Sequence, residues 1–243
     1  MGKILSVISG KGGVGKSTFS VALGNAFCKR GKKVLLIDMD EGLRCLDLML
    51  GIDRTAIFDL ADVLSGKEIE DAIYQSAEME GLSLIPAPAR PDSVSGETLA
   101  QFAKRVEKMF DVVIFDFPAG INMELYTALP PETQFLAVAV PDPVSVRDAS
   151  SIGLRLAEKG IKARLVINRY VYKQSIRFKH KNVDEMIDGA GIRLIGIVPE
   201  SYELANLSLK HKLSRRSKAT AAVLRIAARL EDERVPLPRL KKI

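Results

Sequence analysis

The chain has 243 residues, 47% of them hydrophobic, which is enough for one large α/β domain with a buried core. Its net charge of +6 suits an anionic partner such as DNA or an anionic membrane surface. The two cysteines lack CxxC spacing, which disfavours a disulfide framework and an iron–sulfur carrier. No apolar run is long enough for a membrane-spanning helix, and a predicted strand at the amino terminus leaves no room for a signal peptide, so we expect a cytoplasmic protein.

The most specific motif is GKGGVGKST at residues 10–18, which matches the phosphate-loop pattern G-x-x-x-x-G-K-[ST]. It lies between a predicted buried strand at residues 4–8 and a predicted helix at residues 18–29. Glycines let backbone N–H groups turn towards phosphate oxygens, and the helix adds unpaired donors and the positive end of its dipole. We expect a triphosphate, with Lys16 at the β- and γ-phosphates and the Ser17 hydroxyl on Mg²⁺. The loop residues expected at the nucleotide are Gly10, Lys11, Gly12, Gly13, Val14, Gly15, Lys16, Ser17 and Thr18.

A second lysine, Lys11, lies inside this loop, where the general pattern does not require one. A lysine at this place points away from its own phosphate-binding backbone and could reach a nucleotide on a facing subunit. With it, the loop resembles that of the deviant Walker A ATPases, the MinD/ParA family. The resemblance implies an ATP-dependent sandwich homodimer, in which Lys11 of each subunit contacts the nucleotide of the other and acts in catalysis with Lys16.

Two aspartates, Asp38 and Asp40, end the second predicted strand at residues 33–37. Carboxylates at the carboxyl end of a central strand lie where α/β sheets bind ligands. Asp40 is expected to orient the attacking water and to join the metal ligands, and Asp38 is expected to help hold the metal shell beside the nucleotide. The run that follows, at residues 41–51, resembles the MinD branch of the family.

An apolar strand at residues 111–116 ends in Asp116 and fits the Walker B strand of nucleotide-binding proteins. Asp116 is therefore expected to position Mg²⁺ through a bound water. Residues 116–120 resemble the second switch of MinD-like proteins, in which the N–H of Gly120 would donate to the γ-phosphate and distinguish ATP from ADP.

The adenine base is expected near Asn168, which ends the predicted strand at residues 163–168 and is followed by Arg169. The family uses an asparagine at this place, and its amide offers both a donor and an acceptor to the adenine edge. The turn at Pro199 is expected to lie beside the base, as in relatives.

Two basic runs, at residues 173–181 and 210–218, have two interpretations: a contact to the phosphates of DNA or lipid, or a solvated surface. Residues 235–243 form a short basic and apolar tail after a single ATPase domain at residues 1–234. Membrane-targeting MinD proteins end in an amphipathic helix. The tail has suitable residue types, but its two prolines oppose a helix before Arg239.

Together these patterns predict a P-loop NTPase of the α/β class, with a doubly wound, mostly parallel sheet of about seven or eight strands and helices on both faces. The other expected elements are short helices within residues 54–80, strands at residues 82–86, 135–140 and 194–200, and helices at residues 96–109, 144–159 and 219–230.

The activity we expect is slow, Mg²⁺-dependent hydrolysis of ATP to ADP coupled to dimerisation. Two functions remain open. The first is a MinD-like regulator of division-site or polar placement, which acts at the inner face of the cell membrane with a protein regulator of hydrolysis. The second is a ParA-like partition ATPase whose dimer binds DNA non-specifically. The basic runs favour the second, whereas the motifs at residues 38–51 and 116–121 favour the first, which we take as the leading hypothesis.

Overall fold

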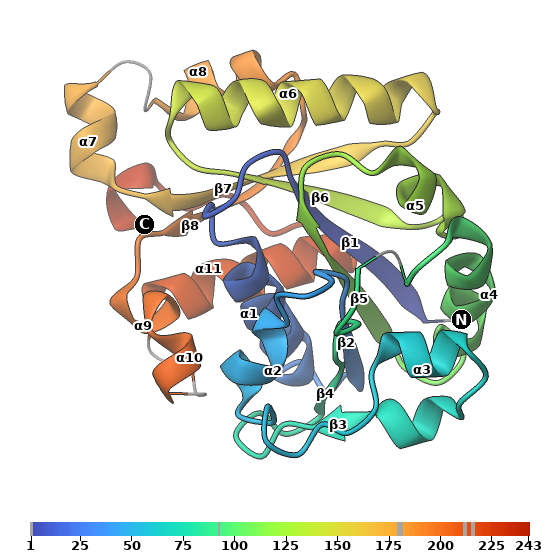
Figure 1. The fold of residues 1–243 in the computed structure, drawn as a ribbon. Helices are drawn as coiled ribbons and strands as arrows, with labels where there is room; N and C mark the ends of the chain where they lie inside the picture. Colours follow the sequence, from blue (N-terminus) through green and yellow to red (C-terminus); the bar gives the residue numbers. More distant parts are fainter. Residues whose placement is uncertain (1, 92, 179–181, 211–212, 215–216) are drawn as a thin grey trace.

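A central sheet of eight strands organises the protein, in the order β3-β4-β2-β5-β1-β6-β7-β8 (Figure 1). The computed structural model describes residues 2–91, 93–178, 182–210, 213–214 and 217–243. Every neighbouring pair of strands is parallel except β3 and β4. The strands are β1 (Lys3–Ser9), β2 (Val34–Asp38), β3 (Tyr74–Gln75), β4 (Leu82–Ile85), β5 (Val112–Ala119), β6 (Gln134–Ala139), β7 (Ala163–Tyr170) and β8 (Leu194–Pro199).

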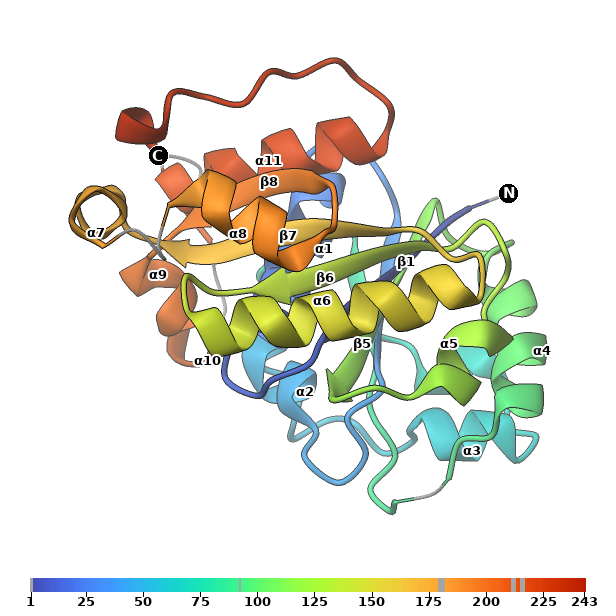
Figure 2. The ribbon, with the colours of Figure 1, turned by 90° about the horizontal axis from the view of Figure 1, so that it is seen from above.

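Helices cover both faces of this sheet and form two separate hydrophobic cores with it (Figure 2). The helices of one face are α1 (Lys16–Cys28), α2 (Cys45–Leu50), α9 (Tyr202–Ala205), α10 (Leu207–Lys210) and α11 (Lys218–Leu230). Those that bury residues against the other face are α3 (Leu60–Leu64), η1 (Ile69–Ala72), α4 (Gly96–Val106), α5 (Met123–Ala128), α6 (Pro143–Glu158) and α8 (Val183–Ala190). Helix α7 (Tyr172–Arg177) follows β7, and a 3-10 turn, η3 (Leu240–Lys242), lies at the end of the chain.

The strand order places the site. The inner strands are nearly continuous apolar runs because both of their faces are covered by helices. The chain builds β2, β4 and β5 on one side of β1 and then crosses to build β6, β7 and β8 on the other. Such a switch point opens a crevice at the carboxyl ends of the strands, where α/β sheets bind ligands. The glycine loop follows β1 at this point.

The predicted fold class is confirmed, and the differences concern short elements. Strand β3 falls inside residues 54–80, where short helices were expected, and forms an antiparallel edge through only two residues. Helices α2, α5 and α7 to α10 were not predicted either. Each has at most eight residues, too few for a stable helix in isolation, so contacts with the rest of the fold determine them.

The tail, residues 235–243, lies against the domain. The guanidinium of Arg229 in α11 donates hydrogen bonds to the carbonyl oxygens of Val235 and Pro236, at 2.8 and 3.0 Å. It also donates to the carbonyl oxygen of Ile195 in the edge strand β8, at 2.7 Å. One side chain thus joins the tail to the edge of the sheet. Within the described residues, no helix combines the length and apolar character needed to cross a bilayer.

Candidate nucleotide-binding site

The glycine loop runs from the end of β1 to Lys16, the first residue of α1. Gly13 and Gly15 have φ values of +76° and +83°, a conformation that side chains rarely allow. A Cβ atom added at Gly12 or Gly13 would meet no atom within 4 Å, whereas one at Gly15 would lie 2.6 Å from Nδ2 of Asn168. The loop therefore borders an open space on one side and is pressed against Asn168 on the other.

A buried ion pair forms the floor of this site. The Nζ atom of Lys16 lies 3.1 Å from Oδ1 of Asp116 and 3.3 Å from the hydroxyl oxygen of Ser17. Ser20 also donates to Oδ1 of Asp116, at 2.8 Å. The second oxygen of Asp116, Oδ2, is buried and has no hydrogen-bond partner within the described residues. A buried carboxylate oxygen without a partner is costly, so it indicates a place for a cation or a water.

The oxygen atoms at this floor fit a magnesium ion that is shared with a nucleotide. Among the described residues, no group of three or more His, Cys, Asp or Glu side chains is arranged to hold a metal ion. Mg²⁺ in nucleotide sites commonly takes one or two carboxylates and receives its remaining oxygens from phosphates and waters. Ser17, Asp40 and Asp116 match this partial set in their residue types.

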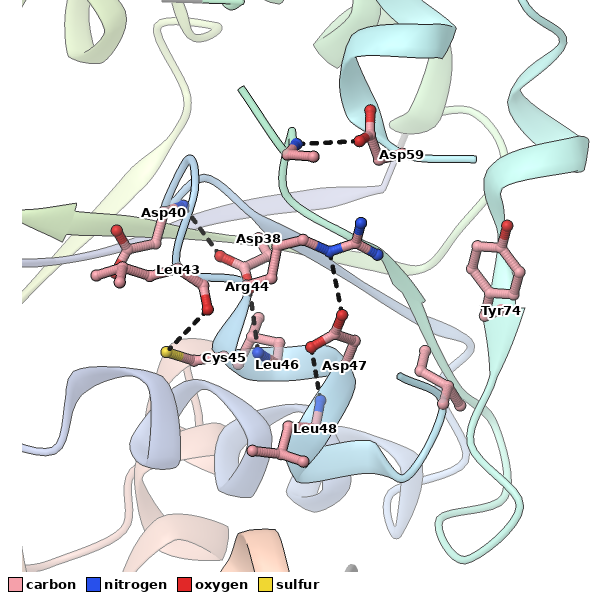
Figure 3. Close-up of polar contacts among 12 residues, drawn as sticks. Asp38, Asp40, Leu43, Arg44, Cys45, Leu46, Asp47, Leu48, Asp59 and Tyr74 are labelled. Carbon is pink, nitrogen blue, oxygen red and sulfur yellow. Dashed lines mark hydrogen bonds and ion pairs between the residues drawn. The ribbon is translucent and has the colours of Figure 1, made fainter. Parts of the chain in front are cut away.

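Asp38 has a role that its sequence position did not reveal. It pairs in register with Asp116 across β2 and β5, so the two carboxylates lie next to each other. Its Oδ1 accepts the N–H of Asp40 at 2.9 Å, and its Oδ2 accepts the N–H of Leu46 at 3.1 Å (Figure 3). Both oxygens are thereby used to fold the segment between β2 and α2, which carries Asp40.

Burial raises the pKa of Asp38 to about 7, and the neighbouring charge of Asp116 adds to this shift. Burial also raises the pKa of the half-buried Asp40, against an opposing effect of Lys16. Asp38 and Asp40 are therefore held in an environment that disfavours their negative charge. A bound cation would relieve it.

We predict that Asp38 makes the free energy of unfolding fall as the pH rises. Its pKa lies at 3.8 in the unfolded reference and at about 7 in the fold, so the folded state holds an additional proton between these values. The stabilisation is complete below about pH 4, is lost as the pH rises through about pH 7, and stays lost above it. Urea unfolding over this range measures the effect.

Asp38→Asn should flatten this pH dependence because its side chain does not titrate, and the exposed Asp53→Asn is the matched control. The difference in unfolding free energy between the wild type and each variant, taken at each pH, separates the contribution of that one residue from those of the other acidic groups. An Asp38→Asn curve as steep as that of Asp53→Asn would contradict the assignment.

The segment at the end of β5, for which the resemblance implies a switch, is hydrogen-bonded to β1. The N–H of Gly120 donates to the carbonyl oxygen of Ser9 at 2.9 Å, and the hydroxyl of Tyr126 donates to the carbonyl oxygen of Gly120 at 3.1 Å. The backbone donor predicted for the γ-phosphate thus has an acceptor within the chain. To contact a phosphate, the N–H of Gly120 must first break its hydrogen bond to the carbonyl oxygen of Ser9.

Lys11 lies on the outer side of the loop. Its Nζ is 3.5 Å from Oδ2 of Asp142, and these side chains are 48% and 40% exposed. Asp142 also accepts the N–H of Ser145 at 3.0 Å as the N-cap of α6, and this bond is the main cause of its lowered pKa, with a smaller effect of Lys11. The prediction did not include Asp142, although an acidic residue before Pro143 is a helix-start signal.

The expected base site is a narrow pocket between the glycine loop and β8. The buried Asn168 donates from Nδ2 to the carbonyl oxygen of Val14 at 2.9 Å, so part of its amide supports the loop. Sequence reasoning did not find the contribution of α9, whose amphipathic pattern is only four residues long. The pocket is lined by Gly15, Thr18, Asn168, Arg169, Pro199, Glu200, Ser201, Leu204 and Ala205.

The mostly parallel sheet, the glycine loop after β1 and the paired aspartates of β2 and β5 define a P-loop nucleotide-binding domain. Residues 5–214 match the profile of the CobQ/CobB/MinD/ParA nucleotide binding domain, and the chain belongs to this family. The resemblance to the MinD/ParA family indicated by the second lysine of the loop is confirmed.

Several similar proteins carry the name MinD. The chain is 34% identical to the septum site-determining protein MinD of Synechocystis sp., over 97% of this chain and 92% of that protein. The MinC:MinD cell division protein complex of Aquifex aeolicus contains a similar chain, with a TM-score of 0.88, 32% identity and 98% coverage of both chains. Pyrococcus horikoshii MinD, solved with Mg-ADP, has a TM-score of 0.81 and 26% identity, covering 95% of this chain and 96% of that one.

Proposed function

We propose that this protein is a MinD-like, Mg²⁺-dependent ATPase that dimerises around ATP. It regulates spatial positioning in the cell, either the selection of the division site or polar placement. The buried pair of Lys16 and Asp116 beside the open glycine loop carries the proposal, because it gathers a cation, an unpartnered carboxylate oxygen and backbone donors around one space. The similar P. horikoshii protein, solved with Mg-ADP, supports the choice of nucleotide and metal.

Each residue of the site has a proposed role. Residues 10–18 hold the phosphates, and Lys16 leaves Asp116 to contact the β- and γ-phosphates. Ser17, Asp40 and Asp116 hold Mg²⁺, which would neutralise charge that develops on the phosphate oxygens. Asp40 also orients the attacking water, while Asp38 fixes the segment that carries Asp40.

The proposed nucleotide contacts extend to the base and to the second subunit. Asn168, Arg169 and Pro199 border the adenine, and Gly120 senses the γ-phosphate once its N–H leaves Ser9. Lys11 leaves Asp142 to reach the nucleotide of the partner subunit.

The proposed setting is the cytoplasm, with peripheral contact at the inner face of the cell membrane and a protein partner that regulates hydrolysis. A relative in complex with MinC supports the presence of a protein partner. ATP would hold two subunits together at their site of action, and hydrolysis would release them. The enzyme then acts by controlling where it is located in the cell, and not through the ADP and phosphate that it releases.

A ParA-like function with non-specific DNA binding is the second candidate, and the basic runs favour it. Lys173 and Arg177 of the first run are exposed on α7. Several members of both runs lie outside the described residues: Lys179, His180, Lys181, His211, Lys212, Arg215 and Arg216.

Asp40→Ala is expected to retain ATP binding and to accumulate as the ATP dimer, because it removes the group that orients the attacking water. Hydrolysis should fall by about a hundredfold or more. Phosphate release and light scattering after gel filtration measure these two properties. The exposed Asp53→Ala serves as the control, and full turnover by Asp40→Ala would exclude the proposed role.

Co-sedimentation separates the two functions. Wild-type protein with ATP or ADP is mixed in parallel with anionic vesicles and with duplex DNA. ATP-dependent binding to vesicles supports the MinD-like function, and ATP-dependent DNA binding that weakens steeply with salt supports the ParA-like one. A protein that neither binds nor hydrolyses ATP would contradict both.

A further inference from the structure

Helix α7 presents an unusual outer face. None of its residues is buried, and it projects at one end of the molecule close to the carboxyl terminus in both views (Figures 1 and 2). Its inner side is fixed, because the Ser175 hydroxyl lies 2.7 Å from the hydroxyl of the buried Tyr170 in β7. The side chain of Tyr172 packs against the core next to it. The orientation of the helix is thereby determined.

The exposed part of the helix combines apolar and basic side chains. Lys173, Ile176 and Arg177 have the i, i+3, i+4 spacing that places residues on one face of a helix. Ile176 is 68% exposed, and Phe178, directly after the helix, is 40% exposed with its ring 5.5 Å from the Arg177 guanidinium. We call Lys173, Ile176, Arg177 and Phe178 the α7 face.

The charge of this face is one-sided. No acidic residue occurs between residues 171 and 178, and neither Lys173 nor Arg177 forms an ion pair among the described residues. In the tail, Leu240 and Ile243 pack against the hydrophobic core, while Leu237 is 48% exposed. The α7 face instead places two exposed large apolar side chains, Ile176 and Phe178, directly beside two cations.

We propose that the α7 face is a contact surface for anionic lipid bilayers, in which Ile176 and Phe178 enter the interface and Lys173 and Arg177 bind lipid phosphates. Interfacial segments use this combination of apolar and basic groups. DNA would engage only the two cations and would leave both apolar side chains in water. The proposal specifies where the membrane partner of the proposed function binds. It rests on that function only for the expected increase in vesicle binding with ATP, since a dimer presents two such faces.

Tryptophan fluorescence tests insertion directly, because the chain contains no native tryptophan. Ile176→Trp in the full-length protein should show a blue-shifted emission with vesicles of phosphatidylcholine and phosphatidylglycerol, and quenching by brominated acyl chains. Leu154→Trp, at a position 64% exposed on α6, is the matched control and should show neither change. If the Ile176→Trp protein co-sediments with the vesicles but its emission spectrum does not change, the proposal is overturned.

Co-sedimentation distinguishes the contributing groups. Ile176→Ser with Phe178→Ser should weaken binding about tenfold or more, while Leu154→Ser should not. Lys173→Gln with Arg177→Gln should weaken binding to anionic vesicles by about fivefold for each cation. Vesicle binding equal to wild type in both double variants would overturn the proposal. Variants that lose DNA binding but keep vesicle binding would also overturn it.

The tail provides a separate control. The triple variant Leu237→Ser, Arg239→Gln and Lys241→Gln should retain most of the vesicle binding. If it loses vesicle binding completely while the α7 variants bind as strongly as wild type, the contact belongs to the tail. ATP turnover is measured in parallel and should equal that of wild type in the α7 variants. A wild type without turnover would refute the proposed ATPase, while the vesicle data with ADP would still decide the α7 face.

Discussion

Lys16→Ala is expected to abolish measurable ATP hydrolysis, with a decrease of at least about a hundredfold, and to remove most ATP binding. Lys16 begins α1 and lies beside Ser17 on the floor of the open glycine loop. It is also the cation that the structure pairs with Asp116. Its removal therefore takes the main positive side chain away from the place where phosphate charge would accumulate. Binding of a fluorescent ATP analogue and phosphate release measure the two losses.

The same variant has a cost in stability that must be measured separately. Alanine at this position leaves the buried Asp116 without its cation, and breaking a buried ion pair in this way typically costs about 3–5 kcal/mol. Lys16→Gln retains a hydrogen-bond donor with less disruption and should show the same loss of hydrolysis in a folded protein. A folded Lys16→Gln protein with wild-type turnover would contradict the proposed role.

Lys11→Ala should weaken the ATP-dependent dimer by about a hundredfold while ATP binding by the monomer stays close to wild type. In the proposed dimer, each subunit contributes one charge-assisted contact through this residue, and two such contacts account for about 3 kcal/mol or more. Among the described residues, Lys11 forms a half-exposed pair with Asp142, which is worth at most about 1 kcal/mol. Sedimentation velocity with ATP, in the Asp40→Ala background, measures the dimer.

Asp142→Asn is the matched variant for this prediction. It releases Lys11 without removing its charge, so dimerisation should equal or exceed that of the wild type. A Lys11→Ala protein that dimerises as strongly as the wild type would show that this lysine does not bridge the subunits.

Local patterns in the sequence determined the class of the fold and the centre of the site. Buried strands of a parallel sheet are continuous apolar runs, and a phosphate loop needs glycines at fixed spacing, so β1, β2, β5 and residues 10–18 could be recognised without long-range information. The carboxylate Asp116 at the end of an apolar strand was visible for the same reason. The second lysine of the loop then indicated the family.

Contacts between distant segments decided the rest. Strand order and register bury Asp38 and place it beside Asp116; burial raises the pKa of Asp38, and the charge of Asp116 adds to the shift. The acceptor of the Gly120 N–H is Ser9, more than a hundred residues away in sequence. Such pairings depend on how the strands associate, and no local pattern encodes them.

The short helices and the tail show the same limit. A helix of six residues such as α7 gains too little from its own hydrogen bonds to be predicted by propensity, and its outward face is fixed by the bond between Ser175 and Tyr170. The tail lies on the domain because Arg229 binds its carbonyl oxygens. The sequence alone thus determined the apolar runs and the phosphate loop, since these depend on neighbouring residues. Only the tertiary structure decided which charged and apolar groups face each other and which face the solvent.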